Sequence, residues 1–128
     1  MKKVLVVEDE VSFLKILDCK LTKGGYKVTR AINGKEGFKK AIKGKPDLIL
    51  LDIKMPIMDG MTMLDLLRQD EVGKKIKVII LTNIEPNDKI IKSVIKDKPL
   101  CFLIKSDTKL NDLIKKIKVI CPVEKIVS

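Results

Sequence analysis

A chain of 128 residues with 27 basic and 17 acidic side chains carries a formal net charge of +10 and has room for one domain. It contains no histidine, which excludes Ser-His-Asp catalysis, histidine-ligated metals and a phosphohistidine carried by this chain. Three cysteines without a C-x-x-C pair predict a reduced, cytoplasmic protein without disulfides or zinc, and no apolar run is long enough to span a membrane.

Five short apolar runs, rich in β-branched residues, are predicted to be strands. They cover residues 3–7, 26–31, 48–51, 77–81 and 100–104. Each is almost continuously apolar, which is typical of a strand that is covered on both faces.

An amphipathic segment of helical period follows each of these strands. The apolar positions predicted to face the sheet are Phe13, Leu14, Leu17 and Leu21, then Phe38, Ala41 and Ile42, then Met63, Leu64 and Leu67, then Ile90, Ile91, Val94 and Ile95, and finally Leu110, Leu113, Ile114 and Ile117. Asn33 and Glu36 form a predicted capping box for the second helix, and Asp107 is the predicted N-cap of the fifth.

Five repeats of strand and helix predict an α/β fold, in which right-handed crossovers place a parallel sheet between layers of helices. We expect one domain over residues 1–121 and a short tail over residues 122–128, with no output domain in this chain. Ligands of open α/β sheets bind outside the carboxyl ends of the strands, so polar residues at those ends are the first candidates for a site.

Acidic, hydroxyl and amine side chains follow four of the five predicted strands. These residues are Glu8 and Asp9 after the first strand, Asp52 after the third, Thr82 after the fourth and Lys105 after the fifth. If these strands are neighbours in the sheet, their side chains converge, and three carboxylates packed together need a cation. Lys105 supplies one positive charge, and a set of oxygen ligands suggests Mg²⁺ as the other.

Such a cleft can perform phosphoryl chemistry. A metal and Lys105 neutralise charge on the phosphoryl oxygens, the Thr82 hydroxyl donates to one of them, and the Asp52 carboxylate is the nucleophile. An acid placed directly after the apolar run "LILL" is unfavourable unless something compensates its burial, which favours a functional role for Asp52.

The sequence resembles the receiver domain of two-component response regulators. The segments "VVEDE", "LILLDIKMPIMDG", "ILTN" and "FLIKS" occur in the order and at the spacing of that family, and the resemblance extends over residues 3–120. It implies a doubly wound, flavodoxin-like (βα)5 fold with strand order 2-1-3-4-5, and a stand-alone receiver similar to chemotaxis regulators.

The resemblance also implies a magnesium site. Its ligands would be Asp9, Asp52 and the backbone carbonyl of Lys54, with Glu8 assisting through a water molecule. Asp52 would accept a phosphoryl group from a histidine of a sensor kinase or phosphotransfer protein.

A switch and an output surface are implied in the same way. Thr82 and Lys105 would contact the phosphoryl group, and Phe102 would change rotamer on activation. The signal would then leave through the fourth helix, fifth strand and fifth helix, towards another protein or a second copy of the chain. No membrane and no specific nucleic acid are expected as partners.

Three positions depart from the usual family pattern. Ser106 follows Lys105 where the family most often has a proline in a cis peptide, so the loop after the fifth strand is expected to be routed differently. Asn83 follows Thr82 where a smaller residue is commoner, and Lys54 stands two residues after Asp52, where its side chain can lean over the site.

Other classes of protein fit the sequence less well. A haloacid-dehalogenase-type phosphatase needs an acid where Lys54 stands, a flavodoxin-like flavin protein needs a hydroxyl-rich phosphate loop in place of "EDEVS", and no Walker-type motif is present. A nucleic-acid binder is favoured only by net charge, since Arg30 and Arg68 are the only arginines. The remaining alternative is a receiver-like module that binds a partner and is never phosphorylated.

Overall fold

The computed structural model describes residues 1–123, in which strands and helices alternate along the chain. The strands are β1 (Lys3–Val7), β2 (Lys27–Ala31), β3 (Leu48–Leu51), β4 (Lys77–Thr82) and β5 (Cys101–Ile104). The helices are α1 (Val11–Lys23), α2 (Gly34–Gly44), α3 (Gly60–Gln69), α4 (Asp88–Asp97) and α5 (Leu110–Ile120). Short 3-10 turns cover Gly73–Lys75 and Lys105–Asp107. The five predicted strands are therefore confirmed, each to within one residue at either end.

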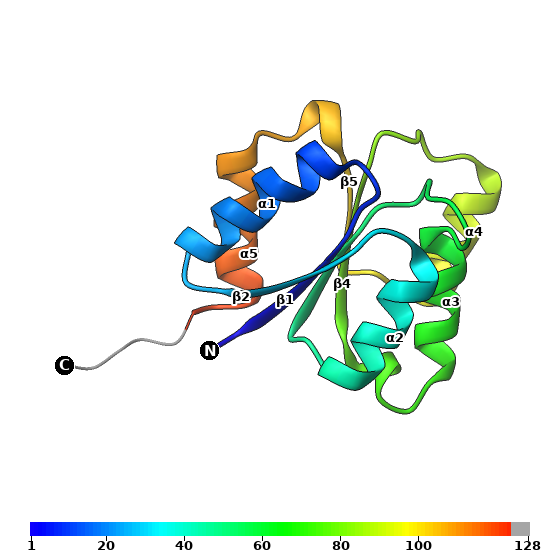
Figure 1. Ribbon diagram of the computed structural model, residues 1–128. Coiled ribbons are helices and arrows are strands. Elements are labelled where there is room, and N and C mark those ends of the chain that lie inside the picture. The colour runs from blue at the N-terminus through cyan, green and yellow to red at the C-terminus, as the bar shows by residue number, and fades with distance from the viewer. Residues whose placement is uncertain (124–128) are drawn as a thin grey trace.

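All five strands are parallel and lie in the order β2-β1-β3-β4-β5. Helices α1 and α5 cover one face of the sheet, and α2, α3 and α4 cover the other (Figure 1). This is the predicted doubly wound (βα)5 fold. The chain reverses its direction of travel across the sheet between β1 and β3, so a cleft is expected at the carboxyl ends of these two strands.

Two hydrophobic cores lie on the two faces of the sheet. In β1, Leu5 and Val7 pack on the side of α2 and α3, whereas Val4 and Val6 pack on the side of α1 and α5. All four residues of β3 are at most 1% exposed. Because the central strands are covered on both faces, both side-chain directions must be apolar, which explains their continuous apolar runs.

The N-terminal cap of α2 is only half of the predicted capping box. The Asn33 side chain accepts a hydrogen bond from the Glu36 N–H at 2.8 Å, as expected. The Glu36 carboxylate does not accept a hydrogen bond from the Asn33 backbone N–H, which a complete capping box requires. It accepts from the Lys40 ammonium at 2.8 Å, because a lysine one turn later offers a charged donor.

The predicted N-cap of the fifth helix is wrong. Asp107 ends the 3-10 turn after β5, and α5 begins only at Leu110, with Lys109 in the cap position. The Thr108 hydroxyl donates to the Ile104 carbonyl at 2.8 Å, and this bond closes the extra turn between strand and helix.

The predicted orientation of α4 is partly wrong. Ile90 is buried and Val94 is half-buried, but Ile91 and Ile95 are 46% and 69% exposed. The buried stripe continues instead to Asp97, which is 3% exposed. A stripe at positions i, i+4 and i+7 covers only one side of a helix, so two isoleucines of α4 remain in solvent.

None of the helices within residues 1–123 combines the length and the apolar character that a membrane crossing requires. The three cysteines are free thiols. The predicted tail at residues 122–128 lies mostly outside the described residues.

Candidate functional site

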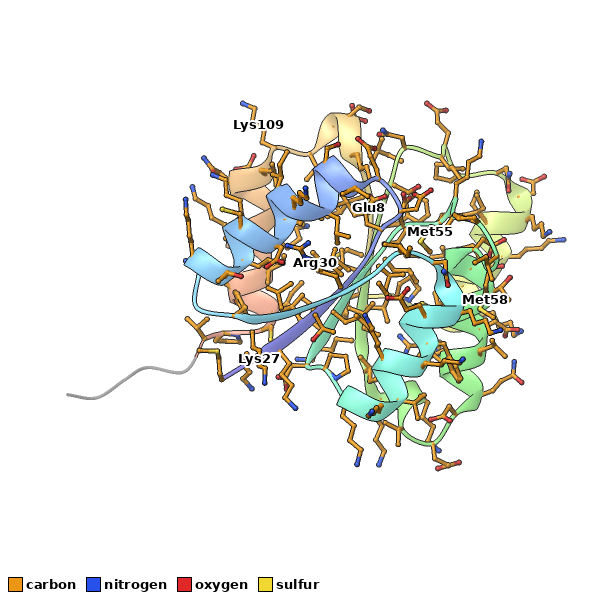
Figure 2. The ribbon with its side chains drawn as sticks, in the orientation of Figure 1. Glu8, Lys27, Arg30, Met55, Met58 and Lys109 are labelled. Carbon is orange, nitrogen blue, oxygen red and sulfur yellow. The ribbon has the colours of Figure 1, made fainter. Side chains whose placement is uncertain are left out.

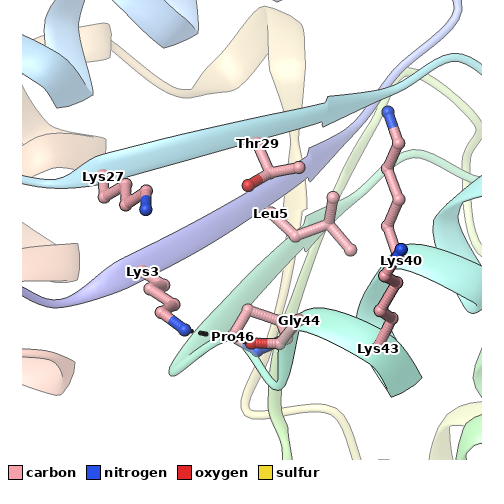
Figure 3. A pocket seen from close by; sticks show the side chains of 8 residues that line it. All are labelled: Lys3, Leu5, Lys27, Thr29, Lys40, Lys43, Gly44 and Pro46. Carbon is pink, nitrogen blue, oxygen red and sulfur yellow. Dashed lines mark hydrogen bonds between the residues drawn. The ribbon is translucent and has the colours of Figure 1, made fainter.

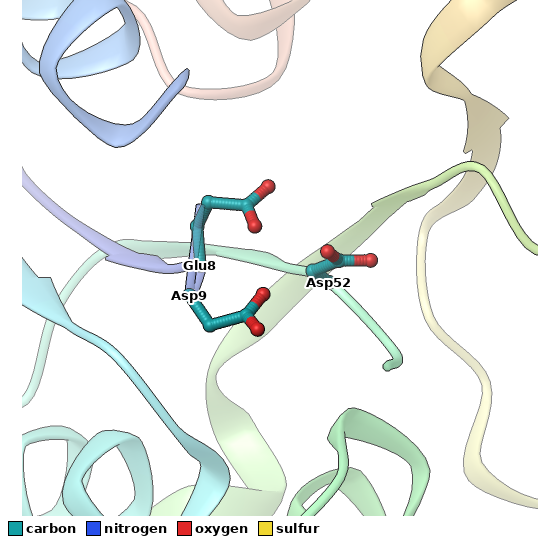
Figure 4. A group of neighbouring side chains, drawn as sticks. All are labelled: Glu8, Asp9 and Asp52. Carbon is teal, nitrogen blue, oxygen red and sulfur yellow. The ribbon is translucent and has the colours of Figure 1, made fainter. Parts of the chain in front are cut away.

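The carboxyl ends of β1 and β3 bring three carboxylates together. One oxygen each from Glu8, Asp9 and Asp52 lies within 4.8 Å of the other two (Figure 4). Glu8 and Asp52 are buried, and the Asp9 side chain is exposed. Glu8 follows β1 at its carboxyl end, and Met55 and Met58 belong to the loop after β3 (Figure 2). The predicted acidic cluster is thus present at the predicted edge of the sheet.

Lys105 reaches this cluster from the end of β5. Its ammonium donates to Asp52 Oδ2 at 3.1 Å and to Glu8 Oε1. It also lies 4.7 Å from the centroid of the Phe13 ring on α1, a cation–π contact. The side chain is held on three sides, so its charge lies at a defined place between two carboxylates.

The electrostatics of the cluster follow from burial. Burial disfavours the charged form of Glu8 and raises the pKa of its carboxyl to about 7, although bonds from Lys105 and the Glu10 N–H oppose the shift. Burial alone would lower the pKa of Lys105, but hydrogen bonds and attraction from Glu8 and Asp52 outweigh it, so that pKa is raised. Lys105 therefore stays protonated at neutral pH.

Asp52 is held rigidly by backbone hydrogen bonds. Its Oδ1 accepts from the Ile53 N–H at 2.7 Å, and its own N–H donates to the Val7 carbonyl at 3.0 Å. The residue is 8% exposed, so it is buried but not completely sealed from solvent.

Thr82 and Phe102 lie on the neighbouring strands β4 and β5. Thr82 is 1% exposed, and its hydroxyl accepts from the Ile84 N–H at 3.3 Å. Among residues 1–123, the structure places no hydrogen bond between Thr82 and Asp52 or Lys105. Phe102 is half-buried against the core on the α2–α4 face. Within residues 1–123, neither side chain forms a hydrogen bond to the acidic cluster.

The donor set fits a hard divalent cation. Three carboxylates supply oxygens from one small volume, and the Lys54 carbonyl accepts no N–H from the part of the chain that the structure describes. Carboxylate and carbonyl oxygens are the ligands that Mg²⁺ prefers in proteins. The exposed Lys54 side chain takes no part in the cluster.

Comparisons with known proteins agree with this geometry. The family model for the response regulator receiver domain matches residues 4–118. The chain belongs to the response regulator receiver family.

Individual relatives show the same relationship. The chain is 37% identical over 81 residues to the sporulation initiation phosphotransferase F of Bacillus subtilis, covering 63% of this chain and 64% of the relative. It is 45% identical over 71 residues to the alkaline phosphatase synthesis transcriptional regulatory protein of the same organism, covering 56% of this chain and 30% of the relative. The chain thus spans less than two thirds of either protein.

Solved structures are also similar. The chemotaxis protein CheY4 of Vibrio cholerae superposes with a TM-score of 0.83 at 28% identity, covering 94% of this chain and 98% of that one. A CheY-like receiver domain protein from Methanospirillum hungatei gives a TM-score of 0.84 at 26% identity, covering 93% and 92%.

Sequence reasoning missed Phe13 as part of the receiver's site, because it counted this residue only in the apolar stripe of α1. The sequence did contain a signal for this role: Phe13 is an aromatic residue in the first turn of a helix that begins next to the site.

Gly60 lets α3 begin directly against the backbone of Asp52 and Ile53, just after β3. Its N–H donates to the Ile53 carbonyl at 2.8 Å, and a Cβ atom here would lie 2.0 Å from the Asp52 carbonyl oxygen. We expect Gly60→Ala to lower the free energy of unfolding by about 3 kcal/mol, measured by denaturant titration, because backbone has to move. Gly44→Ala is the control, since nothing lies within 4 Å of the added carbon. Equal stability of the two variants would contradict this close packing.

Ile57 adopts a left-handed backbone conformation, with φ of 70°, in the loop between β3 and α3. It is 79% exposed, so packing does little to offset the strain of a β-branched residue there. Ile57→Asn should raise the free energy of unfolding by about 1 kcal/mol, because asparagine tolerates this conformation. Ile95→Asn, at an exposed helical isoleucine, should give no such gain; a gain of the same size would mean that lower surface hydrophobicity is the cause.

A cavity of about 360 Å³ lies at the opposite end of the receiver, between β1, β2 and the end of α2 (Figure 3). Lys3, Lys27, Lys40 and Lys43 line it. The Lys3 ammonium donates to the Gly44 carbonyl at 3.3 Å, at the C-terminal end of α2. Cations at this end stabilise a helix, which gives Lys3 a structural explanation.

Proposed function

We propose that this receiver domain is a phosphorylation-activated switch in which Asp52 accepts a phosphoryl group from a phosphohistidine of a sensor kinase or phosphotransfer protein. The observation that carries the proposal is the contact between Lys105 and Asp52, beside two further carboxylates at the carboxyl edge of the sheet. A buried nucleophile next to a fixed ammonium is suited to a dianionic phosphoryl group, because the ammonium offsets the repulsion between the two.

The reaction step is a phosphoryl transfer. An Asp52 carboxylate oxygen attacks the phosphorus, the P–N bond to the donor imidazole breaks, and its electron pair passes to the departing nitrogen. Asp52 then carries an acyl phosphate. The Lys105 ammonium, which donates to Asp52 in the free protein, then donates to a phosphoryl oxygen. The Thr82 hydroxyl gives up its hydrogen bond from the Ile84 N–H and donates to another phosphoryl oxygen.

The metal ligands in this proposal are Asp9, Asp52 and the Lys54 carbonyl, with Glu8 acting through water. Mg²⁺ bound there would supply positive charge to the phosphoryl oxygens. The protein thereby assists its own phosphorylation and dephosphorylation, and we regard it as a signalling protein of the cytoplasm rather than a metabolic enzyme.

The proposed output surface comprises α4, β5 and α5. Ile91 and Ile95 of α4 are 46% and 69% exposed, and Leu100, just before β5, is 50% exposed. Movement of Thr82 leaves room for Phe102 to change rotamer, and this reshapes the same face. We propose that another protein, or a second copy of the chain, binds this apolar patch, and that surrounding lysines steer the encounter more than they add affinity.

Intact-mass measurement after incubation with acetyl phosphate tests the proposal. We expect one phosphoryl group per chain with Mg²⁺ and none when a chelator replaces it. A protein that stays unmodified in Mg²⁺ would instead be a receiver-like module that binds its partner without phosphorylation.

A further inference from the structure

A hydrogen bond outside the acidic cluster joins the two loops that carry Thr82 and Lys105. The Ser106 N–H donates to the side-chain oxygen Oδ1 of Asn83 at 3.1 Å. Both residues are exposed and stand directly after Lys105 and Thr82 in the chain. A backbone N–H group can only donate a hydrogen bond, so its partner in the Asn83 side-chain amide must be the carbonyl oxygen and not the NH2 group.

This bond extends the pairing of β4 and β5 beyond the end of the sheet. The last paired residues of the two strands are Thr82 and Ile104. Past this point the strands separate, and Lys105 begins a 3-10 turn. The Asn83 side chain supplies one more connection, at the position from which Lys105 reaches the acidic cluster.

The backbone on the other side of Asn83 is also restrained. The Ile84 N–H donates to the Thr82 hydroxyl, and this bond spans Asn83 within its own loop. The Asn83 side chain thus contacts the β5 loop, while the Thr82 hydroxyl is bonded within the β4 loop. An alanine at position 83 would leave the Ser106 N–H without this partner.

We propose that Asn83 is a positioning residue for phosphoryl transfer, which holds the Lys105–Ser106 segment at a fixed place relative to Thr82. This role rests on the proposed function of Asp52. Asn83 acts through Lys105, whose ammonium must meet both Asp52 and the incoming phosphoryl group. The two departures from the usual family pattern, Asn83 and Ser106, form one unit, because the N–H that a proline would lack is the donor of this bond.

The hydrogen bond itself is tested by solvent exchange of the Ser106 amide, measured by NMR without any phosphodonor. We expect exchange to be about three- to ten-fold faster in Asn83→Ala, the range set by one neutral hydrogen bond. Asn83→Asp keeps an acceptor oxygen and should retain the protection. Asn111→Ala, at an exposed asparagine of α5, should leave Ser106 unchanged. Unaltered Ser106 exchange in Asn83→Ala overturns the proposal.

The positioning role is tested by the rate of phosphorylation with acetyl phosphate and Mg²⁺ in a double-mutant cycle. We expect Asn83→Ala to lower the rate about three- to ten-fold in the wild-type background and to have no effect in Ser106→Pro, which has no N–H to hold. This comparison is independent of what Ser106→Pro does to the rate alone.

The outcomes separate this inference from the proposed function. An equal loss in both backgrounds, or no loss in either, overturns the role of Asn83 while phosphorylation of Asp52 stands. A wild-type protein that is not phosphorylated at all overturns the proposed function and the positioning role with it, and the exchange measurement still decides whether the bond exists.

Discussion

Asp52→Asn should abolish labelling by acetyl phosphate in the presence of Mg²⁺. The amide keeps the shape of the side chain but lacks the anionic oxygen that attacks phosphorus, so no acyl phosphate forms. We expect a loss of at least about a thousand-fold in the initial rate, by analogy with removal of other enzymic nucleophiles. Intact-mass measurement over time gives the rate and the stoichiometry together.

Asp59→Asn is the matched control, because this aspartate lies in the same loop. Its side chain caps α3 by accepting from the Thr62 N–H at 2.8 Å, and asparagine caps helices about equally well. The control should therefore be phosphorylated like the wild type. Full labelling of Asp52→Asn, or loss of labelling in Asp59→Asn alone, would place the acceptor elsewhere.

Glu8 should make the stability of the metal-free protein depend on pH. Burial raises the pKa of its carboxyl from 4.5 to about 7 in the folded state. Below pH 4.5 the group is protonated in both states and has no effect. Between pH 4.5 and 7 the unfolded state releases a proton that the folded state retains, so the free energy of unfolding falls as pH rises. Above pH 7 the free energy of unfolding has fallen by its full amount, about 3 kcal/mol.

Glu8→Gln removes the ionisable group and should remove this slope. We expect the variant to gain about 3 kcal/mol relative to wild type between pH 5 and pH 8, measured by denaturant titration in buffer with a chelator. Glu10→Gln, at an exposed acid two residues away, controls for the change in net charge. A difference between Glu8→Gln and wild type that stays constant over this range would contradict the argument from burial.

Much of the fold could be predicted because its signals are local. The five strands are apolar runs of four to six residues, and their lengths and positions agree with the sheet to within a residue. The helices follow from an apolar repeat of 3.6 residues. The candidate residues Glu8, Asp52 and Lys105 could be chosen because each stands directly after a strand, and parallel strands end at one edge.

The predictions that failed depended on neighbours that are distant in sequence. The exposed face of α4 is decided by how the helix lies on α3 and the sheet, and a stripe of four isoleucines and valines cannot specify which two of them are covered. The start of α5 at Leu110 is decided by the 3-10 turn that the Thr108 hydroxyl closes. The helical period of the apolar residues predicts neither which residues of α4 are covered nor where α5 begins.

The sequence by itself determined the strands, most of each helix, and the residues that stand at the carboxyl edge of the sheet. Only the tertiary structure decided how those residues meet: that Lys105 lies between Glu8 and Asp52, that Phe13 covers it from α1, and that Asn83 joins the loop after β5. Backbone conformation depends on nearby residues, whereas a contact between side chains 97 positions apart depends on the packing of every element between them.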